Sequence, residues 1–196
     1  MRWSLLTHKN VFVQVKGKHQ LDLLGGDVSG IQAAVQRLNP FIQKAREIGM
    51  MVVWTRSVLA AGKIRPSHRF RRSSTGDIPI AREGSDGVNW YSGIVKPLPN
   101  EYIITKRHYD AFEDTELDLL LQSNGIKTLI FTGFTTNVCV ETTARHGYIK
   151  GYWIILVSDC TDAPTQREYE SAIFNIEKYF GKVATSSEIV ETWETK

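Results

Sequence analysis

Hydrophobic residues recur along the chain in two different patterns. From Asp27 to Gly49 they recur at steps of three and four residues, which predicts an amphipathic helix that Gly49 ends. Pro40 lies inside this helix, where a proline produces a kink or an early break. Short segments rich in apolar residues predict strands at 50–55, 102–105, 128–133, 152–158 and 182–185.

Helical spacing fills the segments between these strands. It predicts helices at about 115–123, 137–151 and 165–179, and a last helix with Ile189, Val190 and Trp193. Strands that alternate with helices form right-handed crossovers and a parallel sheet covered on both faces. The predicted fold class is therefore α/β, a three-layer α/β/α sandwich with a central, mostly parallel sheet. Its 196 residues fit a single domain over 1–196.

Two regions depart from this alternation of strands and helices. Residues 1–20 are atypical, and a regular first strand is missing or replaced there; VFVQV (11–15) alternates with period two and is a candidate replacement strand. Residues 56–100 carry many Gly, Ser and Pro residues and predict a long excursion with short helical pieces. An excursion of this length on a compact domain is usually functional or an assembly contact. We expect Trp90 and Tyr91 to be exposed there, at a subunit contact.

Charge and cysteine content narrow the class of protein. The 24 Lys and Arg residues outnumber the 21 Asp and Glu residues by only three, which gives no reason to expect nucleic acid as a partner. The basic run RPSHRFRR (65–72) is expected to be a solvated loop, with a polyanion or an acidic partner as the alternative. Two cysteines suit a reducing cytoplasm. No apolar run reaches the roughly 18–20 residues of a membrane span, and no signal-peptide pattern opens the chain.

Two chemically capable residues follow predicted strands. Lys106 comes directly after 102–105, and Cys139 comes a short turn after 128–133. Ligands of parallel sheets bind outside the carboxyl ends of the strands. A helix N-terminus there would favour a thiolate on Cys139, and its free N–H groups could hold an oxyanion. Spacing alone leaves a plainer interpretation open, because a lone cysteine at a helix start is more often a small buried residue.

The sequence around both residues resembles a known family. GFTTNVCVETTARHGYIKGY is similar to the signature of the isochorismatase-like cysteine hydrolases, roughly G-x-x-T-x-x-C-V-x-x-T-A. YIITKRHYDAF resembles the segment that carries the family's catalytic lysine, and Lys106 precedes Cys139 by 33 residues, as in that family. The resemblance runs from about Leu21 to Trp193. DVSGIQ and FNIEKYFGKV resemble the branch of ureidoacrylate amidohydrolase, biuret hydrolase and N-carbamoylsarcosine amidohydrolase.

The resemblance implies a Rossmann-like fold and a set of site residues. Cys139 would be the nucleophile and Lys106 a second member of the catalytic triad. The Phe134–Thr135 peptide would be cis, and the backbone N–H groups of Thr135 and Cys139 would form the oxyanion hole. Substrate would contact Tyr109, Phe112 and Asn137.

The third member of the family's triad is not found. In the family it is an aspartate at the end of the first strand, and the spacing back from Lys106 places it at or before Met1. If residues 10–17 form the strand, Gln14 takes the position of the aspartate, and a glutamine cannot act as a base. Asp22 and Asp27 are the nearest carboxylates and are expected to cap the first helix, with a catalytic role for one of them as the alternative.

The resemblance also predicts the chemistry. Nicotinamidases of this superfamily hold a metal with an aspartate and two histidines near the second strand, where this chain offers only His68, so we expect no metal and no cofactor. The expected function is hydrolysis of a C–N bond in a small linear amide, a ureido or carbamoyl compound, by a cytoplasmic dimer or tetramer. Without the aspartate, the alternative is a catalytically impaired relative that serves as a binding or oligomer subunit. A flavodoxin-like nucleotide binder is a weaker alternative, because TGFTTNVC contains no phosphate-binding glycine motif.

Overall fold

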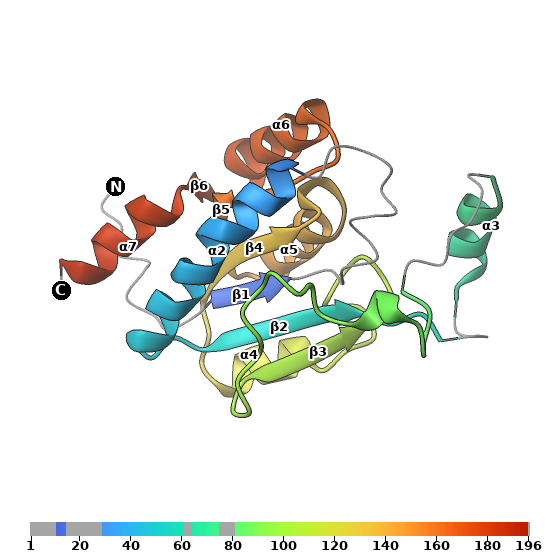
Figure 1. Ribbon diagram of the computed structural model, residues 1–196, viewed down its shortest axis with the longest axis horizontal. Coiled ribbons are helices and arrows are strands. Elements are labelled where there is room, and N and C mark those ends of the chain that lie inside the picture. The colour runs from blue at the N-terminus through green and yellow to red at the C-terminus, as the bar shows by residue number, and fades with distance from the viewer. Residues whose placement is uncertain (1–10, 15–28, 61–63, 75–80, 196) are drawn as a thin grey trace.

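The architecture is a single six-stranded parallel sheet between two layers of helices (Figure 1). A computed structural model describes residues 11–14, 29–60, 64–74 and 81–195. The strand order is β3-β2-β1-β4-β5-β6, and every neighbouring pair is parallel. The strands are β1 (Val11–Gln14), β2 (Val52–Ser57), β3 (Tyr102–Lys106), β4 (Thr128–Phe134), β5 (Trp153–Asp162) and β6 (Lys182–Ala184).

Each face of the sheet has its own apolar core. Successive residues of a strand point to opposite faces, so Trp54 belongs to one buried cluster and its neighbour Val53 to the other. Helices α2 (Ser29–Glu47) and α7 (Ser186–Glu194) pack on the first cluster. The second cluster takes α4 (Leu117–Ser123), α5 (Glu141–Ile149) and, beyond α6 (Gln166–Asn175), the π-helical turn η4 (Ile176–Phe180). The predicted three-layer α/β/α fold is confirmed.

The first long helix continues through its proline. α2 runs unbroken from Ser29 to Glu47, and Pro40 lies on its exposed side. The apolar side of the helix, including Leu38 and Ile42, is fully buried against the sheet. Gly49 ends the helical segment with a φ of 72°, a conformation that glycine adopts without steric cost. The early break expected at Pro40 does not occur.

The alternating segment near the N-terminus forms a strand in the middle of the sheet. β1 pairs with β2 on one side and β4 on the other. Its last residue, Gln14, is in register with Thr55 of β2 and Gly133 of β4. The candidate replacement strand is therefore present over Val11–Gln14. The carboxylates considered above, Asp22 and Asp27, lie outside the described residues.

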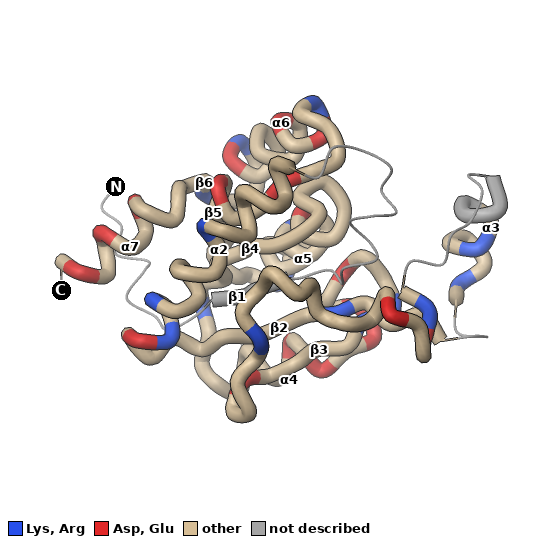
Figure 2. The backbone as a smooth tube through the Cα atoms, in the orientation of Figure 1, with Lys and Arg blue, Asp and Glu red and all other residues tan. Residues whose placement is uncertain are grey.

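The described part of the excursion between β2 and β3 contains two helical pieces, α3 (Pro66–Ser74) and the 3-10 turn η2 (Asp86–Val88), and a bridge between Leu59 and Arg82. The basic run predicted to be a loop is largely helix α3, which projects from the body (Figures 1 and 2). Arg65, just before it, donates to Glu113 and Asp114 at 2.6 and 2.8 Å. Within the described ranges no helix has both the length and the apolarity needed to cross a membrane.

The aromatic residues at the end of this excursion are not exposed to solvent as predicted. Trp90 and Tyr91 are both partly buried and pack against the first core cluster. Trp90 contacts the edge of buried Trp54, with ring centroids 5.4 Å apart. The expectation that these two aromatics are exposed is wrong, because the first core cluster offers them an apolar surface that the local sequence does not reveal.

Candidate functional site

Cys139 lies in a tight turn at the carboxyl end of β4. The strand ends at Phe134, and the Phe134–Thr135 peptide is cis, as the sequence motif predicted. The turn η3 (Thr136–Val140) then has π-helical hydrogen bonding and leads directly into α5. Single π turns of this kind are frequent at functional sites. The side chain of Cys139 is only 1% exposed, so the thiol is enclosed by protein.

Buried hydroxyl groups hold this turn against β5. Thr161 donates to the carbonyl of Gly133 at 2.6 Å, and its hydroxyl lies 2.8 Å from that of Thr136. Thr161 reaches this place because the register between β4 and β5 shifts after Phe131, which pairs with Leu156. The two contacts of Thr161 hold the chain on both sides of the cis peptide.

Lys106 is the last residue of β3 and is 1% exposed. Its ammonium group donates to the carbonyl oxygens of His108 and Tyr109 at 3.1 and 2.5 Å. A buried ammonium requires such partners, because burial without them is very costly. The loop after β3 therefore folds back over the lysine and holds its charge.

The same loop is fastened to the helix that follows Cys139. The hydroxyl of Thr143 accepts a hydrogen bond from Ala111 N–H at 3.1 Å and donates to the carbonyl of Cys139 at 2.7 Å. One turn later, His146 Nδ1 contacts the carboxylate of Asp110. The structure thus connects the segments that carry Lys106 and Cys139, and the sequence analysis did not identify these linking residues.

The predicted substrate residues lie in three different settings. Tyr109 is 38% exposed and lines a cavity of about 410 Å³ together with Arg65, His68 and His108. Phe112 is 5% exposed and stacks on Tyr152 in the second core cluster.

Asn137 occupies the turn itself. Its amide nitrogen donates to Glu168 on α6 at 3.2 Å, and its buried amide oxygen has no hydrogen-bond partner among the described residues. A substrate contact therefore stays a prediction for Tyr109, Phe112 and Asn137, and the packing of Phe112 into the core leaves that side chain little surface for one.

No carboxylate of the described residues ends the central strand. Gln14 holds that place, between Thr55 and Gly133 in the sheet register. Asp162, at the end of β5, pairs in strand register with Phe134, the last residue of β4 before the cysteine turn. A Cβ added to Gly30 would lie 2.1 Å from Asp162 Oδ2, so this carboxylate sits against the first turn of α2. Negative charge is stabilised at that end of a helix.

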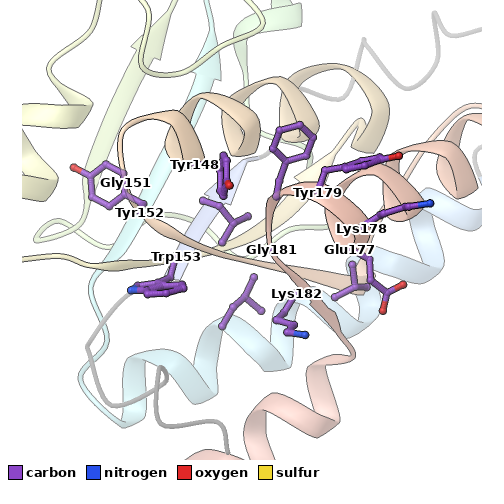
Figure 3. A pocket seen from close by; sticks show the side chains of 13 residues that line it. Tyr148, Gly151, Tyr152, Trp153, Glu177, Lys178, Tyr179, Gly181 and Lys182 are labelled. Atoms are coloured by element: carbon purple, nitrogen blue, oxygen red, sulfur yellow. The ribbon is translucent and has the colours of Figure 1, made fainter. Parts of the chain in front are cut away.

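A larger cavity lies at the opposite end of the strands. It has a volume of about 960 Å³ and lies between the end of α5, η4 and the starts of β5 and β6 (Figure 3). Tyr148, Trp153 and Tyr179 line it and are about half exposed. Neither Cys139 nor Lys106 lines this cavity, so its size does not make it the candidate active site.

Comparison with known proteins identifies the family. The family model for the isochorismatase domain matches residues 10–188. The chain is 33% identical over 186 residues to the ureidoacrylate amidohydrolase RutB of an Enterobacter species, covering 87% of this chain and 80% of that protein. It is 35% identical over 181 residues to the ureidoacrylate amidohydrolase RutB of Methylorubrum extorquens, with 84% and 71% covered.

Solved structures of other proteins share the fold of this chain. A cysteine hydrolase from Pseudomonas syringae pv. phaseolicola superposes with a TM-score of 0.83 at 24% identity, covering 99% of this chain and 96% of that one. A family model that matches almost the whole chain, together with relatives above 30% identity, establishes membership. The chain belongs to the isochorismatase family.

Proposed function

We propose that this chain is a metal-independent cysteine hydrolase that cleaves a C–N bond of a small linear amide, a ureido or carbamoyl compound. The observation that carries the proposal is the placement of Cys139 in a buried turn directly after a cis peptide at the carboxyl end of β4. The loop that holds Lys106 is hydrogen-bonded to the helix that follows this turn. The RutB relatives, named for hydrolysis of ureidoacrylate, support the substrate class.

The proposed reaction has two halves. The thiolate of Cys139 attacks the carbonyl carbon, and the backbone N–H groups of Thr135 and Cys139 stabilise the oxyanion. The C–N bond then breaks, and the nitrogen leaves as ammonia or an amine with the proton that came from the thiol. Water attacks the resulting thioester-type intermediate, the C–S bond breaks, and the acid is released. The Lys106 ammonium favours the thiolate and the developing negative charge.

Turnover of candidate substrates tests this proposal. Ureidoacrylate, biuret and N-carbamoyl amino acids are incubated with the enzyme, and ammonia release is measured. Cys139→Ser is expected to lower kcat by at least about 10³-fold, since the nucleophile is lost. The matched control is Cys160→Ser, because Cys160 is likewise a fully buried cysteine outside any disulfide but lies in the first core cluster. Equal activity in Cys139→Ser and wild type would exclude Cys139 as the nucleophile.

A second candidate function follows from Gln14. A family member without a carboxylate at the end of the central strand could serve as a binding or oligomer subunit with weakened catalysis. The pH dependence of Cys139 alkylation separates the two functions. A half-maximal rate well below about pH 8.5, the value for a free thiol, supports the hydrolase, and a midpoint at that value supports the impaired subunit.

We further propose that the protein acts in the cytoplasm as a homo-oligomer, a dimer or tetramer. Neither of the two buried cysteines forms a disulfide, which fits a reducing compartment. Light scattering coupled to size exclusion gives the molar mass, and a mass of one 22.2 kDa chain would contradict the oligomer.

A further inference from the structure

The strands that carry the two proposed catalytic residues are not neighbours. Lys106 ends β3, whereas Cys139 follows β4, and both β2 and β1 lie between them. Adjacent strands are about 4.8 Å apart, so the axes of β3 and β4 are separated by about 14 Å. The sheet alone therefore does not bring the lysine to the cysteine, and contacts beyond the strand ends must set their relative position.

Thr143 makes the contact that joins the two segments. Its hydroxyl accepts from the backbone N–H of Ala111, five residues after Lys106, and donates to the backbone carbonyl of Cys139. Thr143 is fully buried, so no solvent replaces either partner. One side-chain oxygen thus links the loop after β3 to the turn of Cys139.

A second contact on the same side of α5 supports the first. Thr143 and His146 are three residues apart and therefore neighbours on the helix surface. His146 contacts Asp110, whose other carboxylate oxygen accepts from Phe112 N–H at 2.9 Å. The ring of Phe112 also contacts that of His146, with centroids 5.3 Å apart, so the loop residues on both sides of Ala111 contact α5. Two carbonyls of this loop hold the ammonium of Lys106.

We infer that Thr143 is a positioning residue that sets the placement of the Lys106 loop relative to Cys139. The inference rests on the proposed roles of Cys139 and Lys106. Thr143 touches no reacting atom, and it acts through two backbone groups, Ala111 N–H and the Cys139 carbonyl. Its loss leaves the Ala111 N–H buried without an acceptor, which favours movement of the loop and the lysine away from the thiol.

The test compares Thr143→Val with Thr143→Ser. Valine keeps the shape of the side chain and removes both hydrogen bonds, whereas serine keeps the hydroxyl. Thr143→Val is expected to lower kcat by about 10- to 100-fold with little change in KM, because misplaced catalytic groups slow the chemical step. The same variant is expected to shift the pH midpoint of Cys139 alkylation by iodoacetamide upward, as mapped by mass spectrometry. Thr143→Ser is expected to restore both.

Ile189→Ala controls for loss of stability, because Ile189 is fully buried on α7 in the other core cluster. It is expected to lower the thermal midpoint and leave the alkylation midpoint unchanged. An alkylation midpoint of Thr143→Val equal to that of wild type overturns the inference, and so does the same shift in Thr143→Ser or Ile189→Ala. Failure of the proposed function is seen separately, as full turnover by Cys139→Ser.

Discussion

At the scale of single residues, the site is built from groups that are withdrawn from water. Cys139 and Lys106 are each 1% exposed, and a fully buried lysine is rare unless its charge is paired or hydrogen-bonded. The sequence predicted both residues, from their place after strands and from the family motif. It could not predict Thr143 and His146 as links, because their partners Ala111 and Asp110 are more than thirty residues away and come close only through the fold.

Gln14 gives the sharpest prediction at this scale. It occupies the end of the central strand, where the resemblance places an aspartate, and an amide cannot accept the thiol proton. Gln14→Asp is expected to raise kcat/KM by about 10²-fold or more, the usual contribution of a positioned general base. Gln14→Asn is the matched control, since it has the size of aspartate without the charge. Equal activity in both variants would show that this position carries no proton transfer.

At the scale of elements, one carboxylate fastens the start of β3 to its neighbours. Glu101 accepts from Arg46 on α2 at 2.7 and 2.8 Å, from the indole of Trp54 on β2 at 2.7 Å, and from Leu98 N–H at 2.8 Å. Burial alone would raise the pKa of the Glu101 carboxyl, but the guanidinium of Arg46 and the other two donors lower it below its ordinary value. Its side chain is only 7% exposed, so water offers little replacement.

Glu101→Gln is expected to lower the free energy of unfolding at pH 7 by about 1–3 kcal/mol. The glutamine places an NH2 donor where the carboxylate oxygen accepted a hydrogen bond, so one buried donor loses its acceptor. Since the folded-state pKa is lowered, the stabilisation by Glu101 is full above the ordinary carboxyl value and is lost as the pH falls through the folded value. The difference in the free energy of unfolding between Glu101→Gln and wild type should therefore shrink below about pH 4. Urea unfolding across this pH range measures it, with exposed Glu83→Gln as the control; a constant difference would contradict the account.

Most elements could be predicted from the period of their apolar residues, and the misses have physical causes. The sequence pattern ended the strand predicted at 152–158 at Ser158, whereas β5 continues to Asp162 beyond a register shift, where polar residues interrupt the apolar run. Those extra residues include Thr161, which supports the cysteine turn. The pattern also predicted a regular α-helix from about residue 137. It missed the π turn at Thr136–Val140, because periodicity does not distinguish a π turn from an α turn.

At the scale of the whole molecule, the two ends of the parallel strands carry different features. The carboxyl ends of the strands carry Lys106, the cysteine turn and the loop that joins them. The amino ends of β5 and β6 border the larger cavity with its exposed aromatic side chains. The fold class followed from the alternation of strands and helices, whereas the cavity, assembled from four separate elements, left no pattern in the sequence.

Metal independence is a prediction for the enzyme as a whole. No group of three or more His, Cys, Asp or Glu residues that could bind a metal occurs in the part of the chain that the structure describes. Because the proposed reaction runs through the Cys139 thiolate and uses no metal ion, exhaustive dialysis against EDTA is expected to leave kcat and KM unchanged. Ammonia release before and after dialysis, and again after addition of Zn²⁺ or Mn²⁺, measures this. Loss of activity that one metal restores would contradict the proposed mechanism.

The central claim is that Cys139 forms a covalent bond to substrate, and mass spectrometry of acid-quenched enzyme tests it most directly. The enzyme is mixed with a ureido or carbamoyl substrate, quenched during turnover, digested and analysed. The predicted result is an acyl or carbamoyl mass on the peptide that contains Cys139, none on the peptide of Cys160, and none in Cys139→Ser. Turnover with no adduct on Cys139, accompanied by full activity of Cys139→Ser, would contradict the account.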